Sequence, residues 1–227
     1  MGQNSGYFNN YLRILKEIRA IASEQDRNPD AVQLLAVTKY ASAEQIADLL
    51  KGGVSLVAES RLRESLEKWR SPLLKDYKVK KFFIGRLQTN KAAKVVDNFD
   101  CICSLDSLHL AQAVEKHAAK LGRKVECLVQ IKLTDRETQG GIAPEEAGPF
   151  IETLRKDFKH IFLKGLMAIA PDTDDEELLR SCFKKAKKIF DAYFNPEDCL
   201  SLGMSGDYKI AVAEGSNLPR IGGAVFK

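Results

Sequence analysis

Short apolar runs rich in β-branched residues alternate with helical patterns along nearly the whole sequence, and this alternation limits the possible folds more than any other feature. Such alternation predicts parallel βα units. The expected strands are residues 34–38, 54–57, 81–84, 100–103, 125–131, 162–167, 199–202 and 218–221. Eight parallel strands with intervening helices close naturally into a barrel. We therefore expect an α/β fold, a single (β/α)8 barrel of the TIM type.

The segments between these runs show helical periodicity, and several begin with a recognisable start signal. Ser42 stands three residues before Gln45, the pattern of a capping box, and Pro144 precedes two glutamates. The helices are expected to begin near Ser42, Arg61, Gln88, Asp106, Pro144, Asp174 and Asp207. An additional N-terminal helix is expected from the helical spacing of Tyr11, Leu12, Leu15, Ile18, Ile21 and Ala22.

An open, doubly wound sheet is the alternative arrangement of the same elements. No G-x-G-x-x-G follows any expected strand, and the chain ends just after the eighth one, so the barrel is preferred. The 227 residues, 44% of them hydrophobic, suit one sizeable core. Because no linker-like or low-complexity stretch interrupts them, we expect one domain over residues 1–227.

Charge and hydropathy argue against several kinds of partner. Lysine and arginine total 35 against 31 acidic residues and are spread along the chain, so no nucleic-acid partner is expected. No segment approaches about 18 continuous apolar residues, and the first residues do not resemble a signal peptide. Five cysteines form no C-x-x-C pair. We expect a cytoplasmic monomer with reduced thiols and no membrane partner.

The histidines and paired acids do not suggest a metal or an acid–base pair. His109 and His117 lie eight residues apart and His160 stands alone, which is not a metal-ligand spacing. The acidic run 174–177 opens a helical stretch, where carboxylates suit the helix dipole. No metal site and no catalytic acid pair are expected.

Lys39 directly follows the first expected strand. In a barrel, the working groups lie at the carboxyl ends of the strands, so its amine would stand at the barrel mouth. Low-dielectric walls there favour the neutral amine, which can attack an aldehyde. The alternative is a strand-end lysine that extends into solvent.

The turns after the seventh and eighth strands suit an anion. Gly203, Ser205 and Gly206 follow the seventh strand, and Gly222 and Gly223 follow the eighth. Loops at these two places commonly bind phosphate in this fold, because glycines let main-chain N–H groups approach the anion and a serine adds a donor. Either turn alone could be an ordinary tight turn.

Arg220 lies late in the eighth strand. An arginine has donors and no acceptor, so a side chain that points into the barrel needs a ligand with a lone pair. The alternative is an arginine on the outer face that pairs with a helix carboxylate.

Five motifs in order along the chain resemble the pyridoxal-phosphate homeostasis protein family, which is related to the N-terminal barrel of alanine racemase. They are LAVTK at 35–39, FIGRLQTNK at 83–91, GLMA at 165–168, LSLGMS at 200–205 and RIG at 220–222. The resemblance implies a barrel that holds pyridoxal 5′-phosphate as a Schiff base on Lys39. It also implies phosphate contacts near Ser205, Gly222 and Gly223, with Arg220 facing the pyridine nitrogen.

Two further residues, Ser60 and Met204, complete the expected cofactor site. The chain also departs from the family pattern: Ser60 replaces a common asparagine, Phe82 a common histidine, Gln139 a common lysine and Gly223 a common threonine. The last change leaves the main-chain N–H of Gly223 in place of a hydroxyl.

The resemblance implies a carrier or reservoir in vitamin B6 homeostasis without established turnover, and PLP-dependent apo-enzymes as partners. Two enzymes remain as alternatives, a racemase-like pyridoxal enzyme and a Schiff-base aldolase without cofactor. The positive charge of Arg220 disfavours protonation of the pyridine nitrogen and so disfavours carbanion chemistry. The chain is also expected to be too short for the second domain of an alanine racemase. The aldolase would give Arg220 no clear task.

Overall fold

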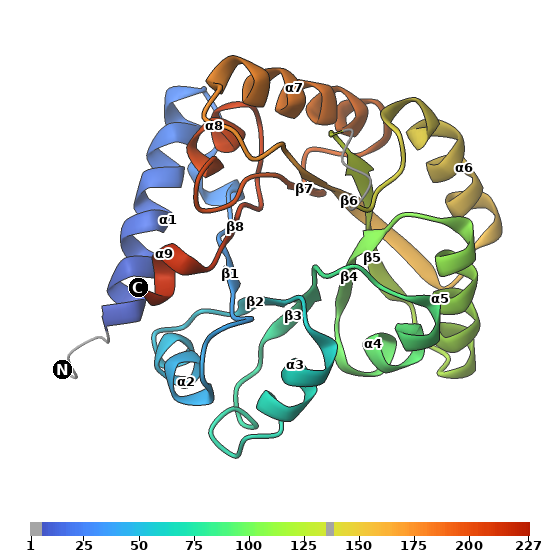
Figure 1. Ribbon diagram of the computed structural model, residues 1–227, viewed down its shortest axis with the longest axis horizontal. Helices are drawn as coiled ribbons and strands as arrows, with labels where there is room; N and C mark the ends of the chain where they lie inside the picture. Colours follow the sequence, from blue (N-terminus) through green and yellow to red (C-terminus); the bar gives the residue numbers. More distant parts are fainter. Residues whose placement is uncertain (1–5, 135–138) are drawn as a thin grey trace.

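The computed structural model describes residues 6–134 and 139–227, and these residues form a nearly closed barrel of parallel strands surrounded by helices (Figure 1). The strands are β1 (Leu35–Val37), β2 (Leu56–Glu59), β3 (Lys80–Phe83), β4 (Cys101–Leu105), β5 (Val125–Lys132), β6 (Ile161–Ile169), β7 (Cys199–Ser201) and β8 (Arg220–Ile221). They lie in the order β7-β6-β5-β4-β3-β2-β1-β8, and every pair is parallel. The expected α/β fold of the TIM type is confirmed.

The seam between β7 and β8 is closed by main-chain and side-chain hydrogen bonds, without a regular ladder. Asn217 and Leu218 donate main-chain N–H groups to the carbonyl of Leu200 at 3.1 and 3.3 Å, and Arg220 donates its N–H to Gly203 at 3.0 Å. The hydroxyl of Ser201 donates to the carbonyl of Leu218 at 2.8 Å. Side-chain bonds therefore replace part of a regular ladder at the place where the sheet returns to itself.

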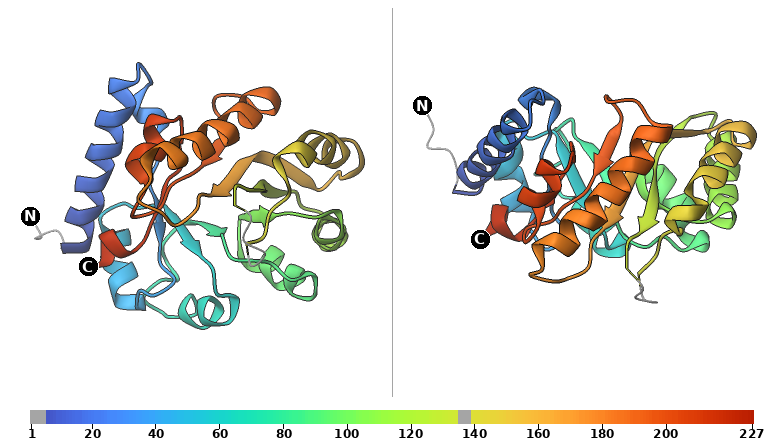
Figure 2. Two further views of the ribbon diagram at one scale, coloured as in Figure 1. Left: turned by 45° about the horizontal axis from the view of Figure 1, so that its top comes forward. Right: turned by 90° about the horizontal axis from the view of Figure 1, so that it is seen from above.

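The helices lie outside the strands (Figures 1 and 2). They are α1 (Gly6–Glu24), α2 (Ala43–Lys51), α3 (Leu62–Lys68), α4 (Ala92–Asn98), α5 (Leu108–Lys120), α6 (Ala147–Asp157), α7 (Glu176–Tyr193), α8 (Tyr208–Ala213) and α9 (Gly223–Phe226), with short 3-10 turns η1 (Pro29–Ala31), η2 (Thr89–Lys91) and η3 (Pro144–Glu146). Among the described helices, none is both long and apolar enough to span a membrane.

Local sequence signals account for several helix starts. Ser42 and Gln45 form the expected capping box at the start of α2. Helix α5 begins near Asp106 as expected, and the hydroxyl of Ser107 accepts the Leu110 N–H at its N-cap. The sequence analysis also missed α9, since four residues are too few for a periodic pattern.

Helix α1 confirms the additional N-terminal helix and connects it to the end of the chain. Its buried face consists of Ile14, Ile18 and Ala22, whereas Leu12, expected on that face, is 41% exposed. Asn10 donates to the carbonyl of Val225 at 3.2 Å. Helices α1 and α9 thus lie side by side, and α9 directly follows the carboxyl end of β8 (Figure 1).

The barrel interior is mainly apolar, and Cys101 and Cys103 lie in it. Cys101 and Cys103 are both buried, and their sulfur atoms are 4.0 Å apart. Burial raises the pKa of Cys101 well above its usual value, so the protonated thiol is favoured. Phe82 lies in the same interior cluster at 2% exposure. The position where the family commonly has histidine therefore belongs to the core.

Candidate functional site

A cavity of about 420 Å³ opens at the carboxyl ends of β1, β7 and β8. Its volume lies within the range of about 300–1,000 Å³ that is usual for small-molecule sites. It is lined by Val37, Lys39, Tyr40, Ala41, Gln45, Ile84, Met204, Ser205, Arg220, Gly222, Gly223, Phe226 and Lys227. Six of the seven residues predicted from the sequence thus line one cavity. The seventh, Ser60, does not.

Lys39 leaves the end of β1 half-buried, between the buried Thr38 and the exposed Tyr40. Its Nζ lies 5.1 Å from the centroid of the Tyr40 ring, and the guanidinium carbon of Arg61 lies 5.0 Å from the same centroid. The Tyr40 ring therefore contacts two cations, Lys39, which lines the cavity, and Arg61, which does not.

A buried network fixes the strand end that carries Lys39. The Thr38 hydroxyl donates to Oε1 of Glu59 at 2.7 Å. The Lys68 ammonium lies 2.8 Å from the same oxygen and donates to the carbonyl of Thr38 at 2.6 Å. Trp69 donates its indole N–H to Glu59 at 3.3 Å. This network was missed in the sequence, where neither Lys68 nor Glu59 has a distinctive spacing.

Arg220 points into the molecule, with only 3% of its surface exposed. Nη1 donates to the carbonyl and hydroxyl oxygens of Ser201 at 2.6 and 3.0 Å, and Nη2 donates to the carbonyl of Ala168 at 3.0 Å. Burial lowers its pKa to about 10, an effect opposed by Cys103 and Asp207. These three bonds use three of five donors, which leaves two without a partner among the described residues. The main-chain acceptors were not foreseen from the sequence.

The turn after β7 is held in shape by Asp207. The Met204 N–H donates to Oδ1 of Asp207 at 2.6 Å, while the N–H groups of Asp207 and Tyr208 donate to the Met204 carbonyl at 3.2 and 2.9 Å. Gly203 has a φ of +87°, which favours glycine. The exposed Ser205 hydroxyl makes no hydrogen bond within the described part of the chain. The turn therefore presents a donor to the cavity.

The turn after β8 brings main chain close to the cavity. A Cβ atom at Gly222 would lie 3.0 Å from the carbonyl oxygen of Val37, so the strand ends of β1 and β8 are closely packed there. Gly223 is exposed and opens the short helix α9. Small residues at both positions leave room beside Ser205, which suits a compact anion.

Ser60 lies in a separate hollow, together with Arg61 and Arg86. Gly85 packs against its main chain, since a Cβ at Gly85 would be 2.1 Å from the Ser60 carbonyl oxygen. Its expected role beside a cofactor remains a prediction.

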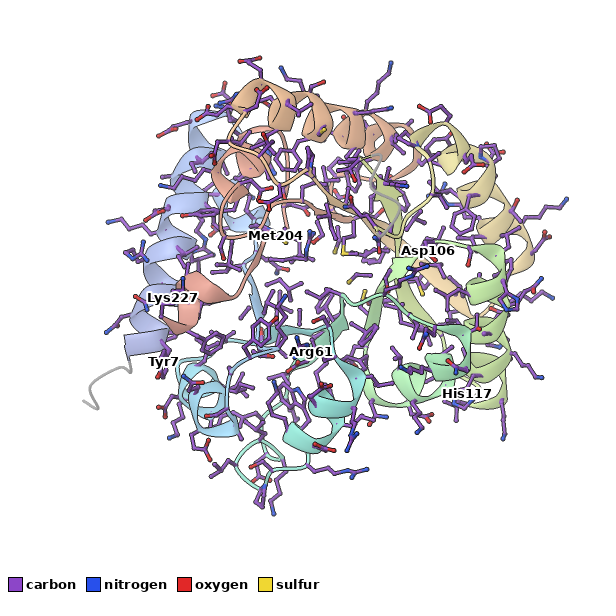
Figure 3. All side chains as sticks on the ribbon, in the orientation of Figure 1. Tyr7, Arg61, Asp106, His117, Met204 and Lys227 are labelled. Atoms are coloured by element: carbon purple, nitrogen blue, oxygen red, sulfur yellow. The ribbon has the colours of Figure 1, made fainter. Side chains whose placement is uncertain are left out.

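A larger cavity of about 620 Å³ adjoins the first and shares Ile84 and Met204 with it. Asp106 lies at this side of the barrel, and burial raises the pKa of its carboxyl, while the Gly141 N–H and Arg86 act in the opposite direction. Figure 3 shows Met204, Asp106 and Arg61 around the barrel mouth, whereas His117 lies on the outer helices. The described residues contain no cluster that could hold a metal.

Comparisons with known proteins agree with this geometry. Residues 13–227 match the family described as alanine racemase, N-terminal domain. A pyridoxal phosphate homeostasis protein of Helicobacter pylori is 36% identical over 197 residues, which cover 86% of this chain and 87% of that protein. PipY of Synechococcus elongatus, solved with PLP bound, is 30% identical with a TM-score of 0.77, over 92% of this chain and 100% of that chain.

An alanine racemase from Clostridium difficile shares the fold alone, with a TM-score of 0.69 and 18% identity. It matches 93% of this chain and only 55% of the racemase chain. The relatives named as homeostasis proteins match along most of both sequences and reach higher identity. The chain belongs to the pyridoxal phosphate homeostasis protein family, whose barrel is that of the alanine racemase N-terminal domain.

Proposed function

We propose that the protein binds pyridoxal 5′-phosphate (PLP) at the barrel mouth and acts as a carrier or reservoir in intracellular vitamin B6 homeostasis. The observation that carries this proposal is the single cavity lined by Lys39, Arg220, Ser205 and the Gly222–Gly223 turn. An amine, a buried cation and a set of anion donors correspond to the aldehyde, the ring nitrogen and the phosphate of PLP. The names of the relatives and the PLP-bound structure of PipY support the same ligand.

Each residue has one expected role. Lys39 holds the aldehyde carbon as a Schiff base, while Ser205 and the N–H groups of Gly222 and Gly223 hold the phosphate. Arg220 directs a remaining donor to the ring nitrogen, and Met204 contacts the ring from the turn after β7. The Thr38–Glu59–Lys68 network acts through the main chain, because it orients the peptide that precedes Lys39.

The electrostatics of Arg220 support binding without turnover. PLP, when bound, supplies an electron sink whose strength depends on the protonation of its ring nitrogen. A buried arginine is a fixed positive charge, so it disfavours a proton on that nitrogen. We propose that the protein retains the cofactor for PLP-dependent apo-enzymes and does not use it on amino acids.

A racemase-like activity is the second candidate, and one observation favours it. Burial raises the pKa of Asp106 beside the adjoining cavity, which favours the protonated form that a general acid needs. Arg220 opposes racemisation, because its positive charge disfavours a proton on the ring nitrogen of PLP.

The test is to load the protein with PLP and incubate it with L- and D-alanine in heavy water. We expect a yellow protein that leaves the α-proton signal of alanine at the level given by free PLP and by the Lys39→Ala variant. Exchange at the rates of ordinary enzymes, roughly 1 to 1000 per second, would establish the racemase reading instead. A protein that is colourless after unbound PLP has been removed would refute the cofactor proposal itself.

A further inference from the structure

Basic side chains gather on one side of the barrel, around α3. Three hollows lie in a row there, and we call them upper, middle and lower. The upper and middle hollows share Leu66 and Arg70, and the middle and lower hollows share Trp69 and Lys81. The upper hollow, about 570 Å³, lies toward the barrel mouth, since Ser60 and Arg86 follow β2 and β3. The lower hollow lies at the amino ends of β3 and β5.

The charge of the molecule is divided unevenly as a result. The basic residues of these hollows are Arg61, Arg63, Arg70, Lys75, Lys78, Lys80, Lys81, Arg86, Lys91, Lys94, Arg123 and Lys124. They face four acidic residues, Glu64, Glu67, Asp100 and Glu126. Twelve basic against four acidic residues leave 23 basic and 27 acidic residues for the rest of the chain, whose totals are 35 and 31. One face is thus strongly positive although the whole chain is only +4.

The upper hollow combines this charge with apolar surface. Leu62, Leu66, Phe83 and Leu87 contribute to its lining, below a rim of six basic side chains. Of these six basic side chains, only Arg63 forms an ion pair within the described part of the chain. Its partner is Glu67 at 3.4 Å, and both side chains are mostly exposed. A concave surface with an apolar floor and unpaired cations suits a small anion that carries a ring.

The upper hollow is also continuous with the barrel mouth. Arg86 lines both this hollow and the 620 Å³ cavity. Arg61, from the same rim, contacts the Tyr40 ring, whose other cation is Lys39. A ligand at this rim therefore lies one side chain away from the Lys39 cavity.

The lower hollow is separated from the barrel mouth. Lys80 is paired with Glu126 at 2.5 Å, and Asp100 accepts the main-chain N–H of Lys81 at 2.7 Å. It shares no residue with either cavity at the mouth. Its charge contributes to the field of the molecule without leading to Lys39.

We propose that the upper hollow is a capture site for small dianionic phosphate esters, from which the phosphorylated cofactor enters the Lys39 cavity. This inference rests on the proposed function and adds an entry site to it. Arginine and lysine rims focus field lines in a cleft and raise association rates by about 10 to 1000-fold, an effect that salt weakens. One arginine can also donate two parallel hydrogen bonds to two oxygens of a phosphate, which makes phosphate esters the expected ligand class.

The test measures how fast PLP and pyridoxal, which lacks the phosphate, form the coloured adduct in stopped flow. Lys91→Gln with Lys94→Gln removes two unpaired cations from the upper hollow only. Lys75→Gln with Lys78→Gln is the matched control, because it removes two lysines at the same spacing from the lower hollow only. We expect PLP to react about 10-fold more slowly with the first pair and at nearly the wild-type rate with the second. The final absorbance and the rate with pyridoxal should not change.

Three results would overturn the proposal. Equal slowing in both pairs would mean that only total charge matters, and equal slowing with pyridoxal would mean damage to the Lys39 cavity. If the Lys91→Gln, Lys94→Gln variant reacted with PLP at the wild-type rate, the hollow would not capture the cofactor. Weaker binding of polyglutamate by the same variant would then assign the hollow to acidic proteins. A wild type that forms no adduct at all would be a different failure, that of the proposed function.

Discussion

Lys68 determines where Lys39 stands, although it does not line the cavity. Its ammonium holds both the Thr38 carbonyl and the buried Glu59 carboxylate, and its side chain is only 12% exposed against 1% for Glu59. A buried carboxylate without its counter-ion is costly, because neither water nor another cation replaces the lost partner. The end of β1 therefore depends on this ion pair.

Replacing Lys68 with methionine tests this dependence. We expect Lys68→Met to lower the free energy of unfolding by roughly 3 kcal/mol, since the Glu59 charge stays buried without its partner. Lys51→Met is the control, because the Lys51–Asp48 pair is 66% and 42% exposed and should contribute less than about 1 kcal/mol. Urea unfolding of both variants measures the difference. Similar small losses in the two would show that the network does not hold the strand end.

For single residues, the sequence indicated those whose side chains are unusual at the end of a strand. Lys39 and Arg220 at strand ends could be predicted, because an amine and a guanidinium there have few structural reasons to exist. Glu59 and Lys68 could not, since their pairing depends on how α3 returns over β2. Asp106 was expected only to mark the start of a helix, and the structure shows it partly buried, accepting the Gly141 N–H.

At the scale of elements, the turn between β7 and α8 shapes one wall of the cavity. Gly203 adopts a φ of +87°, and a Cβ atom there would lie 2.6 Å from the Cβ of Ala211 and 2.8 Å from the Cα of Tyr208. The turn can therefore approach α8 only because this residue has no side chain. Gly206, three residues later, has open space around its Cα.

Alanine substitutions at these two glycines test the turn. We expect Gly203→Ala to cost about 2 kcal/mol of stability, from the left-handed backbone and the contact with α8, and to weaken the retention of PLP. Gly206→Ala should change stability by less than about 1 kcal/mol. Thermal unfolding and dialysis of the loaded proteins measure the two effects. Equal losses in both variants would contradict this account of the turn.

Helix and strand positions were largely predictable because their signals are local. Ser42 caps α2 through hydrogen bonds with Gln45, three residues later. All eight expected strands overlap observed ones. The second strand begins at Leu56, two residues after the expected Val54, and ends at the buried Glu59. The closing seam was not predictable, because Ser201, Ser216 and Arg220 bond across it from distant positions.

At the scale of the whole molecule, the barrel produces two properties that the linear sequence hides. It brings Lys39, Ser205 and Arg220, which are up to 181 positions apart in the chain, to one cavity. It also gathers basic residues on the face around α3, ten of them from residues 61–94 and two, Arg123 and Lys124, from a distant segment. Motif resemblance suggested the first property, whereas the second was missed although most of its residues lie in one stretch of the sequence.

The proposed function depends on Lys39, which is expected to hold the aldehyde of PLP. Lys227 also lines the cavity and offers a second amine, so the two lysines must be distinguished. The most direct measurement is to treat the PLP-loaded protein with borohydride, digest it and locate the added mass by peptide mass spectrometry. We predict the modification on Lys39, and loss of this adduct in Lys39→Ala with the fold retained. An adduct on Lys227 in the wild type, or a bleachable yellow adduct that persists in Lys39→Ala, would contradict the account.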